Sequence, residues 1–200
     1  MTQIDFTVPT DLPNGHVPAI VTYLEMRTRP VPSGTPARPG LALARVPAPA
    51  PETFRTLYRR IGTDYLWSDR LRLDDAALSA ILGDPAVEFY VPEQDGAPVG
   101  MLELDFRNLP DVEIAFFGLV PEAVGAGTGR WLMDRALEIA WREGVNRVWL
   151  HTCTLDHPSA IRFYRSSGFV PYRRTLEVVT DPRLDGLLPM DAAPQIPVIE

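Results

Sequence analysis

The 200-residue chain contains a single cysteine, Cys153, and only three histidines. One cysteine cannot form an internal disulfide, which is compatible with a reducing compartment. One cysteine and three scattered histidines do not supply the clustered ligands of a metal site, so no metal cofactor is expected. The sequence also lacks an apolar stretch long enough to cross a bilayer, and its N-terminus lacks a basic segment followed by an apolar run. We therefore expect a cytoplasmic protein with no membrane partner.

An excess of positive charge is also missing, because the formal net charge is −7. Sequence-independent binding to nucleic-acid phosphates is therefore not expected, and a positively charged acceptor fits the net charge better than a negatively charged one. Hydrophobic residues make up 46% of the chain and charged residues 22%, which is ordinary for a globular protein. This length suits one domain with a sizeable core.

Glycines at every second residue, Gly125, Gly127 and Gly129, mark the stretch around which the chain is organised. The apolar run Val112–Val120, in which Glu113 is the only charge, precedes them and is typical of a buried strand. Behind them, apolar residues recur at helical spacing at Leu132, Met133, Ala136, Leu137, Ala140 and Trp141, and Gly144 stands where a C-terminal cap is expected. The pattern predicts a strand, a glycine loop and a helix.

Such a loop favours a bound anion. The first turn of a helix has unpaired N–H groups and a partial positive charge, and glycines let the backbone approach an oxyanion closely. Hydrogen bonds to a charged acceptor contribute roughly 1.5–3 kcal/mol each, so three or four approach the roughly 8 kcal/mol of micromolar binding. A pyrophosphate is a natural ligand. The loop lacks the Lys-Ser/Thr pair of a Walker site, and its third glycine comes one residue early for a dinucleotide fingerprint. A flexible turn without a ligand is the alternative.

The remaining segments divide the chain into residues 1–40, a proline-rich extension with one extra strand, residues 41–180, the main domain, and residues 181–200, a tail. The extra strand, Ala19–Met26, is expected to pair at a sheet edge. The tail is expected to be an extended strap or disordered, with Leu187, Leu188 and Met190 available for packing. The spacing predicts further strands at Leu41–Val46, Val87–Val91, Pro98–Arg107, Arg147–Thr154 and Phe169–Val179, and helices at Pro51–Ile61, Ala76–Leu82 and Ser159–Ser167.

Two motifs give the chain a family resemblance. The loop 124–129 is similar to the Q/R-x-x-G-x-G/A loop of the GNAT superfamily of N-acetyltransferases, with Val124 in place of Gln or Arg. The family's later motif, N-x-x-A-x-x-F-Y-x-x-x-G-F, is matched at Ala160, Phe163, Tyr164, Gly168 and Phe169, with His157 in place of Asn. The resemblance covers about residues 41–180. It implies an α/β (α+β) fold with a mixed, mostly antiparallel twisted sheet of about six to seven strands and helices on both faces.

The resemblance also implies a site. Acetyl-CoA is the expected cosubstrate, and the residues expected to bind it are Leu119, Val120, Val124, Gly125, Ala126, Gly127, Thr128, Gly129, Arg130 and His157. Main-chain N–H groups around Leu119 and Val120 would polarise the thioester carbonyl. His157 has a second interpretation, as a cap of the short helix that follows it. The candidates for the acceptor side are Tyr65, Trp67, Asp69 and Glu103, although the aromatic rings would also suit the core.

Amide formation from a thioester requires an uncharged amine. Deprotonating an alkyl amine with a pKa near 10.4 at pH 7 costs about 4.6 kcal/mol, so a base must collect that proton directly or through a water. Glu113 is the candidate base, because a carboxylate alone in an apolar strand is expected to have a raised pKa; solvent exposure is the alternative. Glu103 is the substitute, but its neighbours Asp105 and Arg107 suggest an exposed face. The resemblance makes Tyr164 the acid that protonates the leaving thiolate; a core aromatic residue of an amphipathic helix is the alternative.

The sequence thus predicts an N-acetyltransferase that moves an acetyl group from acetyl-CoA to an amine of a small molecule or a peptide. Many relatives are dimers, so a homodimer is one expected arrangement. A non-catalytic CoA-binding or interaction module on the same fold is the alternative, supported by Val124 and His157; a dinucleotide enzyme would need a parallel sheet on both sides of the loop. His151 and Cys153 share a strand face, but no third group to orient a nucleophilic pair is apparent in the sequence.

Overall fold

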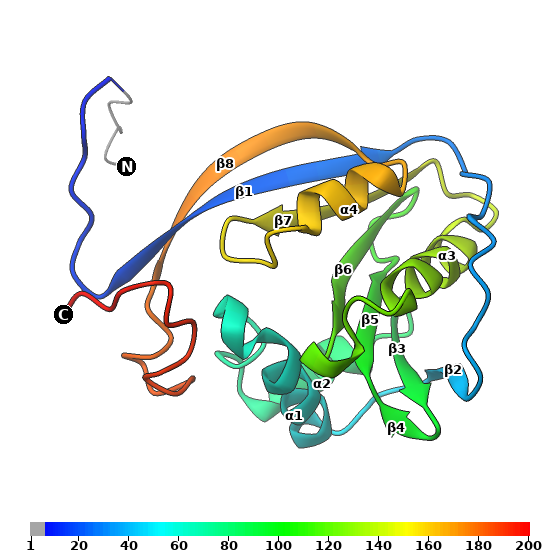
Figure 1. The fold of residues 1–200 in the computed structure, drawn as a ribbon, viewed down its shortest axis with the longest axis horizontal. Helices are drawn as coiled ribbons and strands as arrows, with labels where there is room; N and C mark the ends of the chain where they lie inside the picture. The colour runs from blue at the N-terminus through cyan, green and yellow to red at the C-terminus, as the bar shows by residue number, and fades with distance from the viewer. Residues whose placement is uncertain (1–6) are drawn as a thin grey trace.

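The computed structural model describes residues 7–200, which form one twisted eight-stranded sheet with helices on both faces (Figure 1). Its strands are β1 (His16–Met26), β2 (Leu41–Arg45), β3 (Val87–Gln94), β4 (Ala97–Pro98), β5 (Gly100–Asp105), β6 (Asp111–Leu119), β7 (Arg147–Cys153) and β8 (Val170–Thr180). They are ordered β2–β3–β5–β6–β7–β1–β8, and β4 pairs with β3. Only β6 and β7 run parallel among these described strands. The predicted mixed, mostly antiparallel sheet is confirmed, with one strand more than expected.

Helices cover the two faces of the sheet separately. They are α1 (Pro51–Gly62), α2 (Asp75–Leu82), α3 (Thr128–Ala140) and α4 (Ala160–Ser166), with short 3-10 helices η1 (Thr63–Tyr65) and η2 (Pro121–Ala123). In β5, Leu102 and Leu104 belong to the core that contains α3, whereas Met101 belongs to the core that contains α1 and α2. Because alternate strand residues point to opposite faces, α3 and α1 lie on opposite sides of the sheet.

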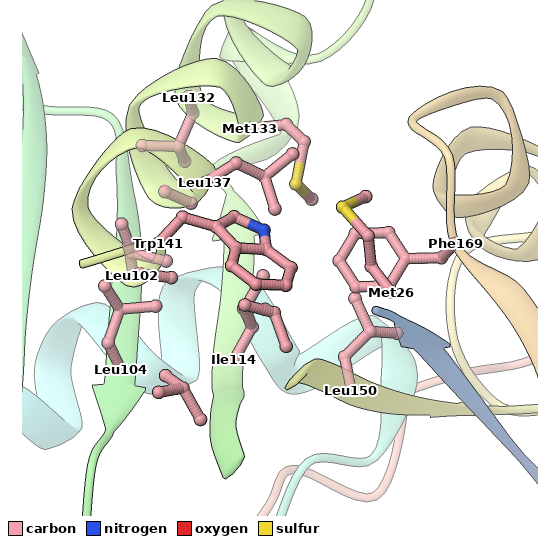
Figure 2. Close-up of a cluster of buried hydrophobic side chains, with 14 of the residues drawn as sticks. Met26, Leu102, Leu104, Ile114, Leu132, Met133, Leu137, Trp141, Leu150 and Phe169 are labelled. Carbon is pink, nitrogen blue, oxygen red and sulfur yellow. The ribbon is translucent and has the colours of Figure 1, made fainter. Parts of the chain in front are cut away.

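The core on the α3 side joins the two halves of the sheet. In Figure 2, Met133, Leu137 and Trp141 of the α3 region lie over Ile114 of β6 and Leu150 of β7. Further core residues in this view are Met26, Leu102, Leu104, Leu132 and Phe169. This continuous apolar layer holds β6 and β7 together at one end, although the two strands separate at the other.

The separation of β6 from β7 creates the opening in which the site lies. The two strands pair over three residues only, from Asp111 opposite Arg147 to Glu113 opposite Trp149, while β6 continues to Leu119. On its other side β6 has a register shift against β5 that leaves Ala115 without an opposite residue. A bulge of this kind bends its strand and increases the local twist. The pairing of β6 with β5 is antiparallel, which is not the parallel surrounding that a dinucleotide enzyme would need.

The N-terminal strand does not lie at a sheet edge, so that prediction is wrong. β1 is longer than predicted and lies between β7 and β8, with Thr22 opposite Thr152 on one side and Arg174 on the other. Alternation in the sequence indicates a strand, but it does not say which strands pair with it. The edge strand on this side is β8, whose eleven residues are exposed except for a half-buried Thr175.

The end of α3 and the C-terminal tail also differ from the predictions. The cap of α3 is Trp141, and Gly144 takes its positive φ of 85° in the turn after the helix. The tail is neither extended nor disordered. Its Arg183 is buried, pairs with Asp181 and donates hydrogen bonds to the carbonyl oxygens of Ala192 and Ile196. Of the three tail residues predicted to be available for packing, Leu188 is buried in the core with α1, Leu187 packs partly buried against it, and Met190 is exposed.

Candidate active site

A cavity of about 550 Å³ occupies the opening between β6 and β7. One end is formed by the glycine loop after η2 and by α4. The other end is formed by the segment after α1 and by the exposed arm of the sheet, β7, β1 and β8. Val124, Gly125, Phe163 and Tyr164 line the first end, and Trp67, Asp69, Ala19, His151, Cys153 and Glu177 line the second.

The glycine loop has the geometry predicted for an anion cradle. Gly125 and Gly127 have φ values of 88° and 84°, a left-handed conformation that residues with a Cβ rarely adopt. Gly127 is the N-cap of α3, no side chain caps the helix, and its first turn contains no acidic residue. The first intrahelical bond of the main chain runs from Trp131 N to Gly127 O, which leaves the preceding N–H groups available. The loop could be predicted from the sequence because glycines mark the positions at which the backbone can adopt a positive φ.

Seven of the ten residues expected to bind acetyl-CoA line the cavity. They are Leu119, Val124, Gly125, Gly127, Gly129, Arg130 and His157. Val120, Ala126 and Thr128 are not on its wall, and the first and last of these are buried elsewhere. The N–H of Val120 donates to Val99 O at 3.0 Å, so it is not free to polarise a carbonyl. Successive strand N–H groups alternate in direction, so the N–H of Leu119 points toward the opening instead.

Arg130 ties the loop end of α3 to α4. Its guanidinium donates to Ser166 O at 3.2 Å and to Ser166 Oγ at 2.8 Å, and it lies 5.5 Å from the centre of the Phe163 ring. His157 accepts a hydrogen bond from the N–H of Ser159 at Nδ1, 3.1 Å away, just before α4. The N-cap of α4 is Ser159, and no side chain caps its first turn, so the contact is a local turn bond and His157 is not the cap. Its ring lines the cavity.

Tyr164 lies where the opening between the strands meets α4. Its side chain is buried, with ring contacts to Phe117 at 6.2 Å and Phe163 at 5.5 Å between centroids. Burial and, secondarily, the charge of Asp156 raise the pKa of Tyr164 above its ordinary value. The phenol therefore keeps its proton at neutral pH and has one to give.

Glu113 has a partner, contrary to the expectation that it stands alone. Its Oε1 lies 3.3 Å from Nδ1 of His151, and the two side chains are 20% and 44% exposed. His151 is on the cavity wall and Glu113 is not. Sequence reasoning missed this pair because residues 38 positions apart are brought together only by the parallel pairing of β6 with β7. The orienting group that the sequence did not reveal for His151 is therefore Glu113.

Glu103 was predicted to lie on an exposed face, and this is wrong. It is fully buried, and its neighbour Asp105 is buried as well, because both faces of β5 are covered. Glu103 pairs with Arg70, and its Oε2 has no partner among the described residues. Burial raises the pKa of Glu103, an effect that Arg70 opposes. Since Glu103 does not line the cavity, the geometry does not support it as a base or an acceptor contact.

The other acceptor candidates, Tyr65, Trp67 and Asp69, all line the cavity. Trp67 donates from Nε1 to Asp156 at 2.9 Å, which joins the α1–α2 side of the cavity to the loop after β7. Asp156 also accepts from Thr152 Oγ1 at 2.7 Å and from Cys153 N at 2.8 Å. Asp156 was not singled out from the sequence, although Asp just before His-Pro at the end of a strand is a usual turn residue.

Cys153 and His151 lie two residues apart on β7, which confirms the predicted shared strand face, and both line the cavity. Burial raises the pKa of the Cys153 thiol to about 11, which disfavours a thiolate nucleophile at neutral pH. No group of three or more His, Cys, Asp or Glu side chains placed to hold a metal ion occurs in residues 7–200. Over the same residues, no helix is long and apolar enough to span a membrane.

Comparisons with known proteins agree with the fold. A mycothiol acetyltransferase from Beutenbergia cavernae is 36% identical over 89 residues, which are 44% of this chain and 30% of that relative. Among solved structures, a GCN5-related N-acetyltransferase from Sphaerobacter thermophilus has a TM-score of 0.60 at 19% identity, covering 82% of this chain and 53% of the other. A protein of the GNAT family from Novosphingobium aromaticivorans has a TM-score of 0.56 at 22% identity, covering 86% and 70%.

The chain thus spans less than a third of the length of the mycothiol acetyltransferase and about half of the Sphaerobacter protein. The structural likenesses, at these identities, establish the fold alone. The family follows from a family model described as "Acetyltransferase (GNAT) family", which matches residues 52–169. Since that match runs from α1 to the residue before β8, over more than half of the sequence, the chain belongs to the GNAT acetyltransferase family.

Proposed function

We propose that this protein transfers an acetyl group from acetyl-CoA directly to an amine acceptor. The observation that carries the proposal is one cavity that extends from the uncapped N-terminus of α3 to a wall lined by the carboxylates of Asp69, Asp156 and Glu177. The GNAT family uses acetyl-CoA as its cosubstrate. Holding a thioester and an amine in one cavity supplies much of the rate of such a reaction, because the encounter becomes effectively unimolecular.

The residues at the loop end fit the diphosphate of coenzyme A. Gly125 and Gly127 present backbone without side chains, and a Cβ placed on either would meet no atom within 4 Å, so the space in front of them is open. The N–H groups at the start of α3 supply donors and partial positive charge. Leu119 N–H, which points into the opening, would polarise the thioester carbonyl.

The opposite end of the cavity suits a cationic amine. Asp69, Asp156 and Glu177 line it, whereas the single arginine among the described wall residues, Arg130, belongs to the loop end. Asp69, in the segment between η1 and α2, and Glu177, in β8, form no ion pair within residues 7–200. A field of one sign in a partly enclosed site raises the local concentration of the oppositely charged substrate.

Proton transfer would involve Glu113 and Tyr164. Glu113 is the carboxylate nearest to the point where β6 and β7 separate, and we assign it the base function, directly or through an intervening group. Tyr164, which is protonated and lines the cavity, would give its proton to the leaving thiolate.

The test measures CoA release with acetyl-CoA and a panel of amines, for the wild type, Glu113→Gln and Tyr164→Phe. Loss of a positioned acid or base lowers the rate about 10²–10⁴-fold, so both variants should lose most of kcat and still bind CoA. Glu52→Gln, a change at an exposed position on α1, is the matched control and should keep full activity. The chain contains no lysine, so transfer to lysine side chains of the enzyme cannot confuse the assay.

A non-catalytic CoA-binding module is the second candidate. The observation in its favour is Val124, which is 46% exposed at the mouth of the cavity where the family motif has a polar residue. Tight binding of CoA by calorimetry, with no turnover across a broad amine panel, would favour this function over acetyl transfer.

A further inference from the structure

Only one member of the Glu113–His151 pair faces the cavity. Glu113 lies on the last residue of β6 that pairs with β7, and it is not on the cavity wall. His151 lies two residues beyond Trp149, where β7 has left β6, and its ring is on the wall with 44% of the side chain exposed. An amine bound in the cavity therefore meets the imidazole before it meets the carboxylate.

The contact between the two side chains fixes the role of each ring nitrogen. With Nδ1 of His151 3.3 Å from Oε1 of Glu113, the tautomer in which Nδ1 carries the proton and donates it to the carboxylate is favoured. Nε2 is then an acceptor, and no partner for it exists among residues 7–200. The ring packs against both Tyr23, at 5.7 Å, and Trp149, at 6.3 Å between centroids. A carboxylate that orients a histidine in this way is the usual arrangement of a general base.

We propose that His151 is the catalytic residue that takes the proton from the acceptor amine, and that Glu113 is a positioning residue that acts through it. This inference rests on the proposed acetyl transfer and assigns its intervening group. Nε2 accepts a proton from the ammonium, and the neutral nitrogen then attacks the acetyl carbon. As the C–N bond forms, the C–S bond breaks and Tyr164 gives its proton to the thiolate. The second proton lost from nitrogen passes to solvent, and solvent returns one proton to the Tyr164 oxygen. The imidazolium releases its proton to solvent.

The charges around His151 support this assignment. Three negative charges favour its protonated form: those of Glu113 on β6, Asp156 in the loop after β7 and Glu177 on β8. Tyr23 of β1 packs against the ring. The hydrogen bond with Glu113 raises the pKa of His151 above its ordinary value of 6.5, and burial opposes that rise. A base must be neutral to accept a proton, so activity should fall as the pH drops through this raised pKa.

The first test is the pH dependence of kcat/KM. His151→Gln should lower kcat about 10²–10⁴-fold, the range for a lost general base, and remove the acidic limb of the profile. Glu113→Gln should keep that limb and move it to lower pH, because the carboxylate that raises the pKa of His151 is gone. The matched control is His16→Gln, since His16 contacts Asn14 O and does not line the cavity. An acidic limb that persists unchanged in His151→Gln would overturn the proposal.

A second test does not depend on turnover. The chain has only three histidines, so proton NMR can follow each imidazole through a pH titration and assign it by single substitution. The His151 signal should titrate above 6.5 in the wild type and at lower pH in Glu113→Gln. An unchanged midpoint would contradict the pairing. If the pair titrates as expected but no amine is acetylated by the wild type, the proposed function fails and the coupling of the two residues stands.

Discussion

Glu103 places a charged side chain in the protein interior, where Arg70 pairs with it. Glu103 is fully buried, Arg70 is 15% exposed, and the guanidinium lies 5.0 Å from the centre of the Phe116 ring on the wall of the cavity. Breaking a buried pair by removing one member leaves an uncompensated charge, which is typically destabilising by about 3–5 kcal/mol. The pair is therefore sensitive to the loss of its arginine.

Replacing Arg70 by Met should destabilise the protein by about 3–5 kcal/mol at pH 8. Burial already raises the pKa of Glu103 above 4.5, and loss of Arg70 removes the main opposing effect. A carboxyl whose folded-state pKa is raised binds more protons in the folded state, so stability increases as the pH falls. Urea unfolding at pH 8 and pH 5 should show a smaller loss at pH 5. Arg59→Met, which breaks a surface pair, is the control and should cost at most about 1 kcal/mol at either pH.

The glycine loop is the element whose proposed function, binding the diphosphate of CoA, depends most directly on backbone conformation. Gly127 and Gly144 have nearly the same φ, 84° and 85°, and a Cβ on either would meet no atom within 4 Å. Alanine at either position should therefore cost a similar amount, about 1–2 kcal/mol for the left-handed conformation. Only Gly127 begins α3 at the cavity, whereas Gly144 lies in the turn before β7.

We expect Gly127→Ala to weaken CoA binding about tenfold, since a 1.4 kcal/mol loss of preorganised donors corresponds to that factor. Both substitutions should lower the unfolding temperature to a similar extent, but Gly144→Ala should leave CoA affinity unchanged. Calorimetric titration and thermal unfolding of both variants separate the two effects. Equal CoA affinity in the two variants would show that the loop does not hold the diphosphate.

An element can be predicted from the sequence when the residues that determine it are neighbours in the chain. Helix α2 begins one residue earlier than predicted, with Asp74 as its N-cap accepting from Ala77 N, because capping is a matter of neighbouring residues. The residues of the glycine loop were predicted for the same reason. The position of β1, the burial of Glu103 and the contact of Glu113 with His151 depend on which distant strands pair, and periodicity does not contain that information.

At the scale of the whole molecule, the sheet consists of two arms that meet at the short β6–β7 pairing. One arm contains β2 to β6, and the other contains β7, β1 and β8. Among the strands of residues 7–200, β8 pairs with β1 alone, so the N-terminal strand connects it to the rest of the sheet. Residues of this arm, Val21, Cys153 and Glu177, form the far wall of the cavity. The end of the cavity proposed for the acceptor therefore depends on a strand outside the segment that the family model matches.

Proline at position 22 tests whether β1 is an interior strand. Thr22 is buried and pairs with a residue of β7 on one side and of β8 on the other. Its main-chain N–H therefore faces a neighbouring strand and not solvent. Loss of one ladder bond and desolvation of its partner cost about 2–4 kcal/mol together, which corresponds to a fall of roughly 4–16 °C in the unfolding temperature of a domain of this size. Thr22→Val is the control, because it keeps the β-branched shape and the N–H, and the Thr22 hydroxyl has no hydrogen bond within residues 7–200. An edge strand can tolerate proline where its N–H faces solvent; equal unfolding temperatures for the two variants would therefore place β1 at an edge and remove it from the cavity wall.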